Sequence, residues 1–250
     1  MSSTSPDPQK LAHIAGWLFV ITFLTSIPAL LLYGPVLNHD SYILGTGSDS
    51  QLSFGAFLEV LLVVANIGTA VALFPVLKRQ SESLALGFVA SRVLESTVIV
   101  VGIVSVMAVV TLRQDAHGDS ASLLLAGQSL VAVKDWTFLL GPGFCSAIGN
   151  GLLLGYLMYR SELVPRGLAL IGVFGGAMAF LAATGALLDV WSKGSAPQNL
   201  LTVGEFVWEL SLGIYLIVKG FRPAALAALG VPEAPRAAGP PAIAVAPAAS

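Results

Sequence analysis

Charged side chains are scarce in this sequence. Asp, Glu, Lys and Arg together make up 10% of its 250 residues, whereas a typical soluble domain contains about 25%. Hydrophobic residues make up 56%, and they occur in long blocks instead of the spacings typical of amphipathic helices or alternating strands. A soluble fold could not bury so much apolar surface. We therefore expect a lipid bilayer to surround most of the chain.

The groups that mark many known sites are also missing. The single cysteine, Cys145, has no CxxC motif or Cys/His partner nearby, which excludes a disulfide framework and a zinc site. No basic cluster exceeds Lys78-Arg79, so no nucleic-acid partner is expected. HExxH, GxSxG and GxxxxGK[ST] are absent, and with them the common catalytic and nucleotide-binding motifs. We expect no enzyme activity, no metal and no cofactor.

Six apolar stretches are long enough to cross a membrane as helices. A bilayer core about 30 Å thick needs about 20 helical residues, whereas barrel strands are about half as long and alternate. The stretches run approximately over residues 11–33, 54–77, 84–110, 136–159, 168–190 and 201–218. The first is longer than the apolar region of a signal peptide, about 7 to 15 residues, and is interpreted as a retained span. The predicted fold is an all-α polytopic membrane protein, a bundle of six transmembrane helices.

The remaining segments define the domain organisation. Residues 1–10 form a short N-terminal segment, residues 11–222 the six-helix domain, and residues 223–250 a Pro/Ala-rich tail that is predicted to be disordered. The connector over residues 114–135 is long. It is either a short interfacial helix or an extension of the fourth span, and the sequence leaves both interpretations open.

Basic residues predict the orientation, because cytoplasmic segments near span ends retain Lys and Arg. Eight lie on one side of the predicted spans, namely Lys10, Lys78, Arg79, Arg160, Arg166, Lys219, Arg222 and Arg236. Three are assigned to loops on the other side, namely Arg113, Lys134 and Lys193. The prediction is a multi-pass protein of the cell membrane with both termini in the cytoplasm.

Two small-residue motifs predict close helix packing. Gly151 and Gly155 lie four residues apart in the fourth stretch, and Gly172 and Gly176 do so in the fifth. Such spacings let two helix backbones approach closely in lipid. We expect contacts within one bundle, in preference to a dimer interface. The oligomeric state stays open.

Ionisable residues inside the apolar stretches are the candidate functional residues. In hydrocarbon they cost about 2.5 to 3.5 kcal/mol each on insertion scales and usually face a bundle interior or water. With two polar companions, the candidate cluster comprises Glu59, Asn66, Arg92, Glu95, Glu205 and Glu209, and Asn150 lies in the fourth stretch. Spacings of three, four or seven residues place the members from each stretch on one helix face. Helical rise places them where they can meet in the outer half of the bundle.

Two interpretations of this cluster remain open. Arg92 can hydrogen-bond one or two glutamates and simply fasten the helices together. Alternatively, four carboxylates facing one guanidinium cannot all stay ionised at low dielectric, and a protonatable site is what a small proton-linked transporter or permease requires. A non-transporting module that binds a lipid, a small ligand or a partner membrane protein is a further alternative.

Several short motifs resemble a known family. They are Ala12-His-Ile-Ala-Gly-Trp17, Arg92-Val-Leu-Glu95, Gly155-Tyr-Leu-Met-Tyr-Arg-Ser161 with Pro165-Arg166, Gly204-Glu205 and Lys219-Gly-Phe221. Over residues 11–222 the chain is similar to domain-of-unknown-function family 4386, uncharacterised bacterial six-helix membrane proteins. The resemblance implies a six-span topology and no established activity or catalytic residues. It makes Arg92, Glu95 and Glu205 the residues to test first.

Overall fold

Helices are the dominant secondary structure of the described part of the chain, which contains no strand. The computed structural model describes residues 7–39, 42–45, 47–115 and 119–231. Its helices are α1 (Pro8–Leu32), α2 (Gly34–Asn38), α3 (Asp49–Leu77), α4 (Glu82–Gln114), α5 (Ser120–Phe138), the π-helices η1 (Leu139–Cys145) and η2 (Ala147–Leu154), α6 (Gly155–Ser161), α7 (Arg166–Leu187), α8 (Ala196–Lys219) and α9 (Pro223–Ala228). Within these residues, six helices are long and apolar enough to cross a membrane. The predicted all-α, six-span fold is confirmed.

The fourth span is longer than the sequence indicated. Helices α5, η1, η2 and α6 continue one another over Ser120–Ser161, a stretch of 42 residues. Its start is capped by Asp119, whose carboxylate accepts a hydrogen bond from the Ser122 backbone N–H. The connector that the sequence left open is therefore mostly an extension of this span. The described residues of the connector do not form a separate interfacial helix. Residues 116–118 lie outside the described part.

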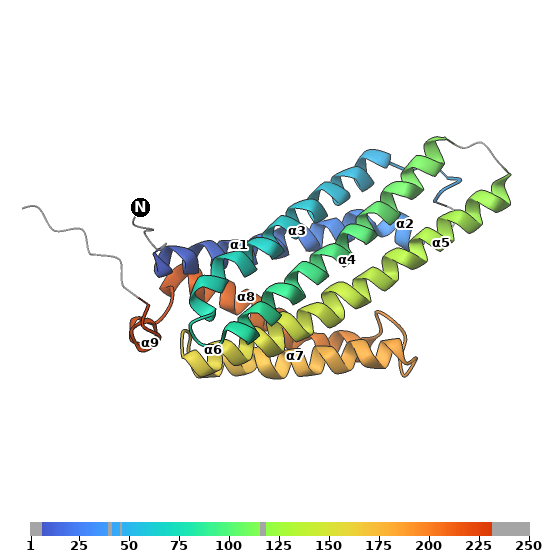
Figure 1. Cartoon of the computed structure of the whole chain (residues 1–250). Helices are drawn as coiled ribbons and strands as arrows, with labels where there is room; N and C mark the ends of the chain where they lie inside the picture. The colour runs from blue at the N-terminus through green and yellow to red at the C-terminus, as the bar shows by residue number, and fades with distance from the viewer. Residues whose placement is uncertain (1–6, 40–41, 46, 116–118, 232–250) are drawn as a thin grey trace, which may run out of the picture.

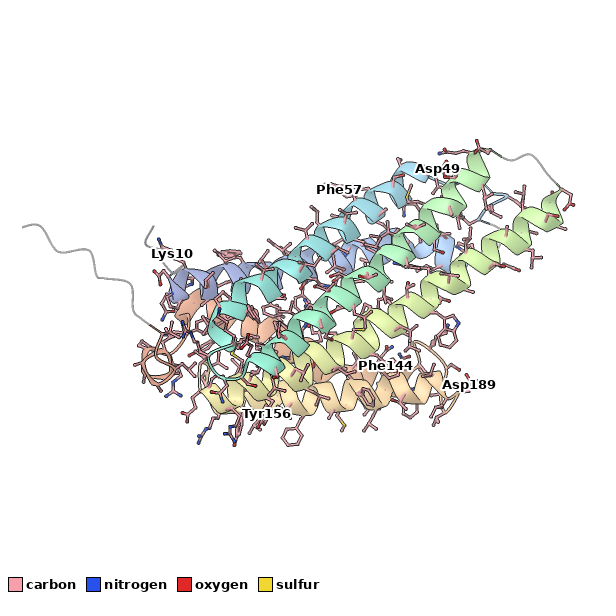
Figure 2. The ribbon with its side chains drawn as sticks, viewed as in Figure 1. Lys10, Asp49, Phe57, Phe144, Tyr156 and Asp189 are labelled. Atoms are coloured by element: carbon pink, nitrogen blue, oxygen red, sulfur yellow. The ribbon has the colours of Figure 1, made fainter. Side chains whose placement is uncertain are left out.

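The long helices run back and forth and pack as a ring, in which α1 lies between α3 and α8, and α7 contacts both α8 and η2. Figure 1 shows that α1 begins at the end where α3 and α8 finish. We call this end the Lys10 end and the opposite one the Asp49 end, after residues labelled in Figure 2. Phe57 and Tyr156 point outward from the bundle in that view and are 53% and 45% exposed. Apolar side chains on the outside are expected where lipid is the solvent.

Glycines allow close helix crossings at several places in the bundle. A Cβ atom on Gly176 of α7 would lie 2.6 Å from the Gly151 Cα of η2, so these backbones touch. The prediction that the small-residue motifs pack within the bundle is confirmed at this crossing. A Cβ atom on Gly16 of α1 would lie 2.8 Å from the Gly213 carbonyl oxygen of α8. Helices α1 and α8 therefore cross closely in the half of α1 that is nearer the Lys10 end.

A side-chain clasp ties the first and last spans at the Lys10 end. The Gln9 amide donates to the Phe221 carbonyl at 2.8 Å and accepts from the Phe221 N–H at 2.9 Å. Beyond it, α9 packs onto the bundle with Ala225 and Leu226 buried. The predicted boundary at Pro223 is therefore corrected, because the ordered fold continues to Val231. Residues 232–250 lie outside the described residues, and the predicted N-terminal segment loses residues 8–10 to α1.

Candidate functional site

A cavity of about 270 Å³ lies inside the bundle between α1, α3, α4, the fourth span and α8. We call it the central cavity. All six residues of the predicted cluster line it, namely Glu59, Asn66, Arg92, Glu95, Glu205 and Glu209. They do not form a single network, however. Their contacts divide them into an arginine group, a lysine group and two further glutamates.

The arginine group joins α3 to α4. The Arg92 Nη1 atom lies 2.8 Å from Glu95 Oε2, and Nη2 donates to Asn66 Oδ1 at 2.5 Å. Asn66 Nδ2 in turn donates to Glu95 Oε1 at 3.3 Å, which closes the group. All three side chains are buried, and Arg92 is 2% exposed. Both charged side chains belong to α4, and Asn66 of α3 is hydrogen-bonded to each of them. Parting the two helices would therefore leave polar groups of this buried pair without partners, which is unfavourable.

The lysine group joins α3 to α5 and corrects the sequence analysis. Lys134 was assigned to a loop, but it is 5% exposed, because its segment continues the fourth span. Its Nζ atom lies 2.6 Å and 2.8 Å from the two carboxylate oxygens of Glu59. The Tyr33 hydroxyl donates to the same carboxylate at 2.9 Å, and Lys134 lies over the Tyr33 ring. Glu59 is thus paired with Lys134, and the cavity contains two cations instead of one.

Glu209 is held by the π-helical part of the fourth span. Its Oε1 atom accepts hydrogen bonds from Ser146 Oγ at 3.0 Å and from the Asn150 amide. Arg92 Nη1 lies 3.8 Å away. Pro142, within η1, has no N–H and interrupts the normal helical hydrogen bonds. Local π-helix is frequent at functional sites, and here it presents Ser146 and Asn150 toward α8.

The distorted backbone of this span is stabilised by its neighbours. Ser91 Oγ of α4 donates to the Cys145 carbonyl at 2.7 Å, and Trp208 Nε1 of α8 donates to the Asn150 carbonyl at 2.9 Å. Such bonds satisfy carbonyl groups that a regular helix would pair internally. Broken or irregular helices in membrane proteins are tolerated where they are buried in protein or line a cavity, which is their position here.

Glu205 differs from the other glutamates because it has no partner. It is 5% exposed and lines the central cavity one helical turn from Glu209. Among the described residues, neither of its carboxylate oxygens has a hydrogen-bond partner. Leaving a buried polar group unsatisfied costs about 1 to 3 kcal/mol, and more if it is charged. A bound proton, cation or hydrogen-bond donor would remove this cost.

The central cavity opens sideways, between α1 and α8. Among its lining residues, Ile27, Leu30, Phe206 and Phe138 are each between 45% and 52% exposed. Toward the Lys10 end, the Phe23 and Phe206 rings meet edge to face with centroids 4.8 Å apart. Ile27 and Leu30 follow Phe23 along α1, so the opening lies on the Asp49 side of this aromatic pair.

In the described parts of the chain, no three His, Cys, Asp or Glu residues are placed to hold a metal ion together. What the geometry offers is a partly apolar cavity with buried carboxylates and two fixed cations.

Comparisons with known proteins support the family resemblance and add no activity. The family model described as Domain of unknown function (DUF4386) matches residues 14–220. No curated protein and no solved structure matches the chain.

Proposed function

This chain belongs to the DUF4386 family, a domain of unknown function, and from that premise we propose that it is a small proton-linked transporter or permease and not an enzyme. The observation that carries the proposal is Glu205, a buried carboxyl on the wall of the central cavity that has no hydrogen-bond partner in the described part of the chain. Ionisable groups inside a membrane usually mark a pathway for protons or substrates. A carboxyl that can take up or release a proton beside a ligand cavity is what proton coupling needs.

The fastener interpretation accounts for only part of the cluster. The Arg92 group and the Lys134–Glu59 pair join neighbouring helices and contribute to the fold. Glu205 joins nothing, and the cavity reaches Glu95 and Glu209 as a transport site would require. A fully paired and tightly filled cluster would have favoured a purely structural role.

The proposed setting is the cell membrane, with both termini in the cytoplasm. Lys134 is buried, so among the described residues only Arg113 and Lys193 count for the Asp49 end. Seven basic residues of the described part count for the Lys10 end. The positive-inside tendency then assigns the Lys10 end to the cytoplasm. In this orientation the central cavity lies in the outer half of the bundle.

A second candidate function is a membrane module that binds a lipid without transporting it. The sideways opening beside Ile27 and Leu30 favours it, because a lipid chain could enter there from the bilayer. The two functions differ in whether the cavity becomes accessible from both sides of the membrane.

That difference gives a test that needs no known substrate. Ser26 lines the cavity and makes no hydrogen bond through its side chain in the described structure, so Ser26→Cys is a small change. In a Cys145→Ala background, we expect a membrane-impermeant thiol reagent to label this cysteine from either side of oriented vesicles. The labelling rates should shift in opposite directions when a pH gradient is reversed. Cys145→Ala alone is the matched control and should remain unlabelled.

Labelling from one face only, at every pH and gradient, would contradict transport. It would favour the lipid-binding module, since a static cavity needs no second entrance.

A further inference from the structure

We infer that the ligand of the central cavity is a monovalent organic cation, an ammonium group with an apolar body, held by Glu205 and Glu209. The inference deepens the proposed function by naming its substrate class, and it rests on that function only for the movement of the ligand. Binding itself is a separate property of the cavity.

The distribution of charge points to a cation. Each fixed cation already has a close carboxylate, since Arg92 lies 2.8 Å from Glu95 and Lys134 lies 2.6 Å from Glu59. Four glutamates and two basic residues line the cavity, so two glutamates exceed the cations. An anionic ligand would add to this excess negative charge, which is unfavourable in a low-dielectric site.

The two remaining glutamates, Glu205 and Glu209, differ in their hydrogen-bond partners. Glu209 accepts hydrogen bonds from Ser146 and Asn150 and has Arg92 at 3.8 Å. Glu205 has no partner at all among the described residues. The group that completes the site therefore belongs beside Glu205, one helical turn from Glu209, where both carboxyls can face it.

The walls select an organic cation over an inorganic ion. The aromatic rings of Phe23, Phe138 and Phe206 and the side chain of Ile27 belong to the lining of the cavity that contains Glu205. Hard metal ions prefer a complete shell of about six or more oxygen ligands, whereas apolar side chains make up part of the wall here and offer none. An ammonium group is attracted to aromatic faces as well as to carboxylates. The cavity volume of about 270 Å³ is near the lower limit of about 300 Å³ for ligand pockets and fits a small molecule.

Sharing one carboxyl between proton and ligand would couple their movements. A protonated Glu205 offers no negative charge to an ammonium group, and an ammonium group at Glu205 disfavours protonation. Binding of the two is therefore competitive. Exchange of one proton for one monovalent cation leaves the net charge of the site unchanged.

Binding can be measured on the full chain in nanodiscs with three probes that share a phenyl ring. They are benzyltrimethylammonium, neutral benzyl alcohol and anionic benzenesulfonate. By calorimetry we expect the cation to bind at least tenfold more tightly than the other two, and more weakly as the pH is lowered. Glu205→Gln should reduce its affinity at least tenfold. Glu162→Gln removes an exposed carboxylate outside the cavity and should leave the affinity unchanged.

The outcomes separate the ligand class from the transport function. Equal binding of the cation and the alcohol, or full affinity in Glu205→Gln, would overturn the inference. If Glu205→Gln does not fold, the preference among probes and its pH dependence in the wild type decide alone. A cation preference combined with Ser26→Cys labelling from one face would retain the ligand class and reject transport. Labelling from both faces without a cation preference would support transport and reject the proposed ligand class.

Discussion

The pair formed by Lys134 and Glu59 is the residue-scale feature that bears most directly on stability. The two side chains are 6% and 11% exposed, and the tyrosine hydroxyl of Tyr33 occupies a further acceptor site on the carboxylate. Removing one member leaves the other charge buried and unpaired. Removing both leaves a mostly apolar contact.

We expect Lys134→Met to destabilise the protein by about 3 to 5 kcal/mol, the usual cost of breaking a buried ion pair. The double variant Lys134→Met with Glu59→Leu should recover part of that loss, because no charge remains unpaired although the Tyr33 hydroxyl loses its acceptor. Arg166→Met, which removes an exposed ion pair with Glu162, is the control and should cost less than about 1 kcal/mol. Reversible unfolding in detergent micelles measures all four proteins. A double variant as unstable as the single one would show that the pair is not what stabilises this contact.

The same pair shows that the sequence predicted which residues line the site but not which of them pair with one another. The six predicted residues all line the central cavity. They could be found from the sequence because a polar side chain within an apolar stretch usually faces the bundle interior. Their partners depend on how helices are rotated and staggered, which no single stretch encodes. Lys134 was missed because its segment carries too few apolar residues to be included in a span. Only the helical continuity from Ser120 places it inside the bundle.

At the scale of elements, the contact between α7 and η2 depends on glycine. Gly151 and Gly176 bring the two backbones together without intervening side chains. The GxxxG spacing in each stretch predicted such an approach, whereas the π-helical character of η2 was not predicted. Pro142 marks a break in any helix, but whether the result is a kink or a π-helix depends on the neighbouring Ser91 and Trp208.

We expect Gly176→Ala to force α7 away from η2 and to lower stability by about 1 to 3 kcal/mol, as overpacking typically does. Its matched control is Gly167→Ala in the same helix. A Cβ atom at Gly167 has no atom within 4 Å, so that substitution should be neutral or slightly stabilising. Thermal unfolding of the two variants, compared with the wild type, checks the difference. Equal melting temperatures would show that the crossing tolerates a methyl group.

For the whole molecule, the bilayer makes the fold the most predictable property. Each crossing needs about 20 helical residues, so hydropathy alone located six spans, with errors where polar residues extend a helix. The Lys10 end gathers the first residues of α1, α4 and α7, as Figure 1 shows. No comparable rule predicts the ligand from the sequence. The proposed function consequently rests on the geometry of the cavity.

The proposed orientation gives a prediction for the molecule as a whole. In the Cys145→Ala background, cysteines that replace Lys78 and Arg160 should not react with an impermeant thiol reagent in intact cells. They should react once the cells are permeabilised. A cysteine that replaces Lys193 should be labelled in intact cells. All three positions are exposed, so failure to react would not come from burial. The opposite labelling pattern would invert the topology, and labelling of Lys78→Cys and Arg160→Cys from different faces would contradict the six-span arrangement.

The close crossing of Gly16 with Gly213 would let α1 and α8 pivot about a point that lies nearer the Lys10 end. The arm from Gly16 to Leu30 is about 21 Å long and that from Gly16 to Gln9 about 10 Å, from the helical rise. If the helix ends at Leu30 moved toward α8 by ~2 Å, the ends at Gln9 would move away from α8 by ~1 Å, from the ratio of the two lengths. The bonds between Gln9 and Phe221 resist that spread. In the proposed transporter, these bonds would hold the Lys10 end together and so keep the opposite end open until α1 and α8 close there on a ligand.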